Sequence, residues 1–254
     1  MPGNNRRGWP VQRDMRPSAA EITCLVLMYK APKRSKQRLA ATGCDSAAEI
    51  AGALLDCALE DLRAWPGPIC LAPASEDDRR FLVGTDKLPD SVATASRPLI
   101  WAEQGEGNLG TRIHSVSGQL AEAGHARQIF IGIDCPGLSI DILRTAADCL
   151  TNTDAVLVPA FDGGVVLMGA NSPWPALEGL PWSQPELGTA LLEACLADGG
   201  QCITLEPRHD LDEQSDLSVV LDEIAADRRP ARRVLRRVLT DALSAIAVPS
   251  AADR

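Results

Sequence analysis

Short apolar runs alternate with amphipathic stretches along most of this chain, and this alternation constrains the fold more than any other feature. The run ITCLVLMY (22–29) is almost continuously apolar, as expected for a strand buried on both faces of a sheet. The stretch 46–65 that follows places Ile50, Leu54 and Cys57 on one helical face. Strands that alternate with helices predict a single, mainly parallel α/β sheet with helices on both faces.

The rest of the chain continues this order. Further strands are expected at 68–73, 97–103, 127–133, 154–160, 164–170 and 201–206, and further helices at 77–84, 109–124, 139–150 and 185–200. Ser46 and Glu49 have the spacing of a capping box at the start of the helix 46–65. We expect one α/β domain over 21–227, after a disordered tail (1–20) and before a basic amphipathic helix and tail (228–254).

Charge and composition exclude several classes of function. The formal net charge is -9 and 4% of the residues are aromatic, which argues against binding to nucleic acid or anionic membranes. The longest apolar runs are shorter than the roughly 20 residues of a membrane span. The eight cysteines include no C-x-x-C pair and no export signal is visible, so we expect reduced thiols and a cytoplasmic location.

A basic loop follows the first predicted strand. Five of the nine residues 30–38 are basic, in an otherwise acidic chain. Ligands of open α/β sheets bind beyond the carboxyl ends of the strands, so Lys30, Lys36 and Arg38 are candidates for gripping a phosphate. A solvated surface loop explains the same charges about equally well.

The segment GEGNLG (105–110) lies between a predicted strand and a predicted helix. It has the literal G-x-G-x-x-G spacing of a dinucleotide-binding turn, and Asp134 lies at about the distance of that motif's ribose-binding acid. The milder interpretation is a glycine-rich turn that presents the amides of a helix N-terminus to an anion.

Acidic residues also follow the later strands. Asp134 comes directly after the strand 127–133, where it could reach a metal ion or begin a turn. Asp162 precedes two glycines and could hold a sugar hydroxyl, act as a base, or form a plain turn. We expect Asp210 and Asp212 to point in opposite directions, so that only one need face the site, and Asp216 to cap the next helix. Cys135 has no histidine neighbour in the sequence and is more typical of a buried structural thiol than of a nucleophile.

Six segments of the chain resemble, in order, the motif series of the GT-A-like bacterial glycosyltransferases of the arsenosugar-biosynthesis type. That family is related to nucleotide-diphospho-sugar transferases and to cofactor guanylyltransferases. The segments are KAPKRSKQRL, QGEGNLGTRI, GIDCPG, DGGVVLMG, WSQPEL and DLDEQSDL, within residues 22–217. The resemblance implies a GT-A, nucleotide-diphospho-sugar transferase-like fold.

The resemblance also implies roles for individual residues. It makes Asp134, Asp212 and Asp210 the ligands of Mg²⁺ or Mn²⁺, and Asp162 and Asp134 the catalytic residues. Nucleotide and phosphate contacts would come from Lys30, Lys36, Arg38, Gln104, Gly107, Asn108, Gly110 and Arg112. Contacts to the donor sugar or the acceptor would come from Gly163, Gly164 and Trp182.

The sequence therefore predicts a metal-dependent glycosyltransferase-like enzyme that uses a nucleotide-diphospho-sugar and a small-molecule acceptor of unknown identity. The alternatives are a nucleotidyltransferase acting on a nucleoside triphosphate, a non-catalytic nucleotide-binding module and an NAD-linked oxidoreductase. The non-catalytic alternative is favoured by a shortened first loop and by departures from the family pattern at Gln37, Asn108, Val165 and Gln184. The sequence leaves the oligomeric state open.

Overall fold

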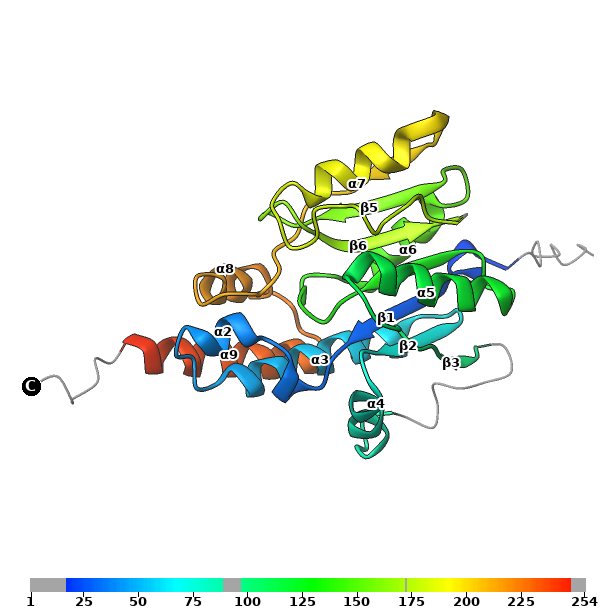
Figure 1. The fold of residues 1–254 in the computed structure, drawn as a ribbon. Helices are drawn as coiled ribbons and strands as arrows, with labels where there is room; N and C mark the ends of the chain where they lie inside the picture. Colours follow the sequence, from blue (N-terminus) through cyan, green and yellow to red (C-terminus); the bar gives the residue numbers. More distant parts are fainter. Residues whose placement is uncertain (1–16, 89–96, 172, 248–254) are drawn as a thin grey trace, which may run out of the picture.

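The computed structural model describes residues 17–88, 97–171 and 173–247 (Figure 1). Within these residues, seven strands form one sheet in the order β3-β2-β1-β4-β6-β5-β7. The strands are β1 (Cys24–Tyr29), β2 (Ile69–Pro73), β3 (Leu99–Trp101), β4 (Gln128–Ile131), β5 (Ala155–Pro159), β6 (Val165–Ala170) and β7 (Cys202–Thr204). Strand β6 runs antiparallel to β4 and β5, and the other pairs are parallel, which confirms the predicted mainly parallel sheet.

Both faces of the sheet are covered by helices, as the apolar strands predicted (Figure 1). Along β1, Leu25 and Leu27 join a core with α3 (Ala47–Ala64) and α6 (Ile140–Cys149). The alternate residues Cys24 and Val26 join a second core with α5 (Leu109–Glu122) and α7 (Leu187–Leu196). Because neighbouring residues of a strand point to opposite faces, the continuous apolar run of β1 fills both cores.

A third apolar cluster lies on the far side of α3. Ile50 and Leu54 of that helix pack with residues of α2 (Gln37–Ala41), α8 (Asp216–Glu223) and α9 (Pro230–Ala247). Leu235 and Leu239 of α9 are fully buried there. The basic C-terminal helix therefore packs on the domain, and the predicted boundary at residue 227 falls between two helices that share one core.

The structure corrects some local predictions. Ser46 lies at the start of α3, but its side chain makes no capping hydrogen bond, so the predicted capping box is wrong. A capping box does form at Ser18 and Glu21, and the short helix α1 (Ala19–Ile22) that it caps begins inside the predicted disordered tail (1–20). Residues 1–16 and 248–254 of the predicted tails lie outside the described residues.

Three other elements complete the described chain. Helix α4 (Glu76–Val83) follows β2, close to its predicted position. A 3₁₀ turn (Pro32–Arg34) begins the basic loop after β1, and another (Ala197–Gly199) ends the helical stretch after α7. Among the described residues, none of the helices is long and apolar enough to cross a membrane.

Candidate functional site

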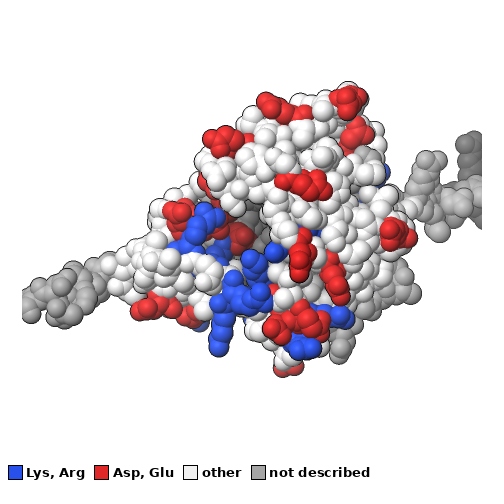
Figure 2. Space-filling view, in the orientation of Figure 1, with Lys and Arg blue, Asp and Glu red and all other residues white. Residues whose placement is uncertain are grey.

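A cavity of about 580 Å³ opens beyond the carboxyl ends of β1 and β4, where open α/β sheets bind their ligands. Figure 2 shows lysine and arginine side chains gathered around a hollow in the middle of this face, with acidic atoms beside them. Met28, Phe130 and Met168 of the sheet contribute apolar lining. The volume lies within the usual range for small-molecule sites, about 300–1,000 Å³.

Most of the predicted site residues meet at this cavity although they come from distant parts of the sequence. Those that line it are Lys30, Lys36, Arg38, Gln104, Gly107, Arg112, Asp134, Asp210 and Asp212. Gln104 is nearly buried, with its side-chain nitrogen donating to the carbonyl of Ala72 at 2.6 Å. Arg112 donates to the carbonyl of Gly107 at 3.0 Å, which holds its guanidinium at the rim.

The ammonium of Lys36 lies between the two acids that were predicted to hold a metal ion. It forms ion pairs with Asp134 and with Asp212, the latter at 3.0 Å, and donates to the carbonyl of Leu211. The side chain is only 2% exposed. Burial would lower the pKa of Lys36, but the two carboxylates outweigh it and raise the pKa, so the ammonium stays charged. Its three N–H donors are matched by three protein acceptors, so a phosphate would have to replace one of them.

The backbone before Lys36 is fixed by a buried acid that the sequence did not single out. Asp78 of α4 is fully buried and accepts from the backbone N–H of Ala31 at 2.8 Å. It also pairs with Arg34 at 3.1 Å, and Ser75 donates to it at 2.7 Å. The half-exposed side chain of Arg34 fastens the loop to α4 and also lines the cavity.

Asp210 and Asp212 both face the cavity, contrary to the prediction that they point in opposite directions. Residues two apart lie on the same side of an extended chain, and Leu211 between them is buried in the third apolar cluster. The N–H of Leu211 donates to the carbonyl of Asp134 at 2.9 Å, which brings the two acidic segments together. Asp216 accepts from the N–H groups of Asp212 and Glu213, so it holds this loop in place.

The carboxylates of the site differ in their surroundings. Burial, together with the nearby charges of Asp162 and Asp212, raises the pKa of Asp210 to about 7. Burial would also raise the pKa of Asp212, but the cations of Lys36 and Arg38 outweigh it and hold that pKa below its usual range. Among the described residues Asp210 has no ion pair of its own, so the site carries an acid without a matching cation.

The donor set fits a hard divalent cation in part. Carboxylate oxygens are the ligands of Mg²⁺, which is commonly held by one or two carboxylates together with substrate phosphates. Within the described part of the chain, no group of three or more histidine, cysteine, aspartate and glutamate side chains is arranged to hold a metal ion without such help. A metal ion here would rest on one or two of the acids Asp134, Asp210 and Asp212 together with substrate phosphates, and Lys36 pairs with two of these acids.

Other predicted contact residues have structural partners and do not line the cavity. Asn108 caps α5, accepting from the N–H of Thr111 at 3.0 Å and donating to the carbonyl of Glu178 at 2.7 Å. A Cβ at Gly110 would overlap the carbonyl of Leu177 and the indole nitrogen of Trp182. The third glycine of GEGNLG is thus required by the packing of α5 against the segment 177–182.

The turn after β5 is shaped in the same way by its neighbours. Asp162 accepts from the N–H of Gly164 at 2.8 Å, as a plain turn would require. Gly163 has φ of +92°, and a Cβ there would overlap the carbonyl of Pro185. Asp162 nevertheless acts on the site, since its negative charge helps to raise the pKa of Asp210.

The sequence did not indicate the residues that connect the segment around Gly137 with the segment around His209. Glu223 of α8 accepts from the N–H of His209 at 3.2 Å and lies against Gly137. Such contacts join residues far apart in the sequence and leave no local pattern. Cys135 is buried, which raises the pKa of its thiol, in agreement with the predicted structural role.

The comparisons with known proteins support the fold. A family model described as "uncharacterized protein conserved in bacteria (DUF2064)" matches residues 69–184. That segment contains Asp134 and the glycine-rich turn, but not the basic loop or the segment 209–217. A search of curated proteins gave no match.

Solved structures give a wider match. A protein from Desulfovibrio desulfuricans G20, described provisionally as a nucleotide-diphospho-sugar transferase, is 21% identical with a TM-score of 0.70 and covers 87% of this chain and 98% of its own. A cytidylyltransferase from Leptospira borgpetersenii is 12% identical with a TM-score of 0.48, covering 88% and 93%. The first match confirms the predicted nucleotide-diphospho-sugar transferase-like α/β fold, and the second is too distant to add to it.

Proposed function

We propose that this chain is a divalent-metal-dependent transferase that takes a nucleotide-diphospho-sugar as donor and passes the sugar to a small hydroxyl-bearing acceptor. The observation that carries the proposal is the cavity beyond β1 and β4, where acids from two segments meet basic side chains from the first loop and α5. The description of the similarly folded Desulfovibrio protein agrees with this choice of donor.

The partly exposed cations of this cavity suit a diphosphate. Lys30, Arg38 and Arg112 line it, and Arg38 is 60% exposed on its side chain, so these groups can turn toward a ligand. Arginine offers a bidentate fork to phosphate oxygens and lysine a point charge. Together they would balance the negative charge that develops on the departing nucleoside diphosphate.

The acids would act on the other side of the diphosphate. Asp134 and Asp210, with Asp212, would hold Mg²⁺ or Mn²⁺, which when bound stabilises the charge on the leaving phosphates. Asp162 is exposed beside Asp210 and is the candidate base for the acceptor hydroxyl. In that role it would take the proton as the acceptor oxygen bonds to the sugar.

A thermal-shift screen of nucleotides and nucleotide-diphospho-sugars, with and without Mn²⁺, tests the proposal. A ligand present at 100 times its Kd stabilises a protein by about 2.7 kcal/mol, or about 5–11 °C for a chain of this size. We expect Asp134→Ala to lose the Mn²⁺-dependent part of the shift. Asp148→Ala, an exposed acid of α6, is the matched control and should keep it.

Product analysis then separates the proposed reaction from its alternatives. Release of a nucleoside diphosphate from the sugar donor supports glycosyl transfer, whereas release of pyrophosphate from a nucleoside triphosphate would make the chain a nucleotidyltransferase. A shift with NADH but with none of the sugar nucleotides would refute the proposal. Binding without turnover of any donor would instead support a non-catalytic module.

A further inference from the structure

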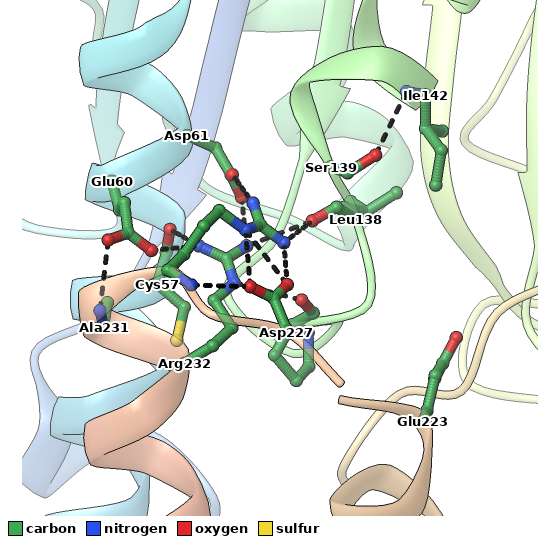
Figure 3. Close-up of polar contacts among 12 residues, drawn as sticks. Cys57, Glu60, Asp61, Leu138, Ser139, Ile142, Glu223, Asp227, Ala231 and Arg232 are labelled. Carbon is green, nitrogen blue, oxygen red and sulfur yellow. Dashed lines mark hydrogen bonds and ion pairs between the residues drawn. The ribbon is translucent and has the colours of Figure 1, made fainter. Parts of the chain in front are cut away.

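A buried arginine joins helix α9 to the loop that follows Asp134 (Figure 3). Arg232 lies in the first turn of α9 and is 0% exposed. Burial of a guanidinium is costly unless its charge is paired and its donors are all used. The hydrogen-bond partners of this side chain therefore indicate which segments of the chain it holds together.

All five N–H donors of the guanidinium have partners. Two of the acceptors are carbonyls of the loop after Asp134, and the others belong to α3. The partners are the carbonyls of Pro136 at 3.2 Å, Leu138 at 3.1 Å and Cys57 at 2.6 Å, and the carboxylates of Glu60 at 3.1 Å and Asp61. The five donors of an arginine form a rigid fork, so these contacts fix the loop relative to α3 as well as to α9.

A second arginine reinforces the same junction. Arg229 donates to the carbonyl of Leu138 at 3.1 Å and pairs with Asp61 at 2.5 Å. Asp227 holds Arg229 in place at 2.6 Å. The buried carboxylate of Asp61 thus serves both arginines, and the carbonyl of Leu138 accepts from both.

The loop held by these arginines leads directly to the candidate site. Pro136 and Leu138 are two and four residues beyond Asp134, in a turn closed by the N–H of Leu138 on the carbonyl of Cys135 at 3.3 Å. The carbonyl of Asp134 in turn holds Leu211, which lies between Asp210 and Asp212. A shift of the turn would therefore move the acids of both segments.

We infer that Arg232, assisted by Arg229, is a positioning residue that sets the Asp134 turn for ligand binding at the candidate site. This inference rests on the proposed function. The cavity is built from β1, β4 and the loops, while the support that fixes its acidic edge comes from a C-terminal helix outside the span 69–184 of the family match.

The test compares two buried positions of α9. Arg232→Lys keeps a positive charge near Asp61 but has three donors on a single nitrogen, so it cannot replace all five contacts of the guanidinium. Leu239→Ala is the control, because Leu239 is also fully buried on α9 and packs in the third cluster away from the turn. Amide hydrogen exchange of peptides spanning 133–139 and the affinity for Mn²⁺ with UDP or with GDP are measured for both.

We expect faster exchange at 133–139 in Arg232→Lys than in Leu239→Ala. We also expect an affinity for the Mn²⁺–nucleotide pair that is lower by about 10- to 100-fold, as for other groups that orient ligating side chains. Arg229→Lys, at a partly exposed position, should show the same changes more weakly and serves if Arg232→Lys does not fold. Equal exchange in the arginine and leucine variants would overturn the inference, as would faster exchange with unchanged affinity.

A wild-type protein that binds neither nucleotide with Mn²⁺ would refute the proposed function instead. The exchange comparison would still decide whether Arg232 orders the turn, because it is made on the protein without ligand. The two failures are therefore distinguishable.

Discussion

At the scale of single residues, Lys36 has the most demanding environment in the site. Its backbone is left-handed, with φ of 53°, and its ammonium is buried against Asp134 and Asp212. A left-handed conformation costs a residue with a Cβ about 1–2 kcal/mol. The ion pairs that accompany this conformation place a positive charge between two of the acids proposed as metal ligands.

We expect Lys36→Met to bind Mn²⁺ more tightly than the wild type when no nucleotide is present. Removing the ammonium frees Asp134 and Asp212 for the metal ion and abolishes its repulsion of a second cation. A gain of about tenfold, or about 1.4 kcal/mol, is expected in calorimetric titration. Lys33→Met removes the same charge from an exposed position of the loop and should leave the affinity unchanged. An unaltered or weaker affinity in Lys36→Met would contradict this account.

A second prediction concerns the pH dependence of stability. The folded-state pKa of Asp210, about 7, lies above its unfolded value, about 3.9, so the folded protein binds more protons between them. Stability contributed by this group is therefore lost as the pH rises from about 4 to about 7. In the presence of a chelator, Asp210→Asn should be more stable than the wild type at pH 7.5 by about 1 kcal/mol or more, or about 2–4 °C.

Thermal unfolding of both proteins between pH 4 and pH 8 checks this. The difference in stability between Asp210→Asn and the wild type should become smaller as the pH falls and vanish near pH 4. A stability difference that stays constant with pH would show that the Asp210 side chain affects stability through something other than its charge.

At the scale of elements, the hairpin β5–β6 is fitted closely to the start of α7. The carbonyl of Gly163 in its turn accepts from the N–H of Gly188 at 2.8 Å, and the carbonyl of Pro185 approaches the α-carbon side of Gly163. Glycine is needed there for two reasons, its positive φ and the absence of a Cβ. The turn sequence DGG thus serves the packing of two elements, whatever it does for a ligand.

We expect Gly163→Ala to be destabilised by more than the about 1–2 kcal/mol of a left-handed alanine, because its Cβ would also displace the 185–188 segment. Gly199→Ala is the matched control. Gly199 also has a positive φ, of 84°, but nothing lies within 4 Å of a Cβ built there. Chemical denaturation of both variants measures the difference. Equal losses of stability in Gly163→Ala and Gly199→Ala would mean that the 185–188 segment moves aside at no cost in free energy.

At the scale of the whole molecule, α3 connects two apolar clusters. Its inner face contributes to the core beneath the sheet, and its outer face to the cluster shared with α8 and α9. Leu235 and Leu239 of α9 are fully buried, and burial of each contributes about 1.5–3 kcal/mol. Their sum is a large fraction of the about 5–15 kcal/mol of a typical domain.

A chain ending at residue 227 should therefore lose its cooperative thermal transition or unfold at a much lower temperature. It would expose Ile50 and Leu54 and leave the buried Asp61 without its arginines. Circular dichroism on heating measures this, with the full-length Val234→Ala protein, altered at an exposed position of α9, as control. A wild-type transition in the shorter chain would support the domain boundary that the sequence predicted.

The order of strands and helices could be predicted because it depends on local patterns. The continuous apolar run of β1 and the recurring apolar residues of α3 each signal their burial within a few residues, although α3 is buried on two faces. The edge of the sheet at which the cavity lies was also predictable, since Lys30 and Asp134 follow strands whose carboxyl ends meet at that edge. The prediction that Asp210 and Asp212 point in opposite directions was wrong, although the buried Leu211 between them held the necessary signal.

The sequence by itself determined a mainly parallel α/β sheet and a set of charged residues at one of its edges, because hydrophobic periodicity and strand ends are local properties. Only the tertiary structure decided which charges belong together. Lys36 meets Asp212 across 176 positions, and Arg232 meets Pro136 across 96. Such pairings are set by how the layers pack, and that packing turned Lys36 inward onto the acids and made the C-terminal helix a support of the site.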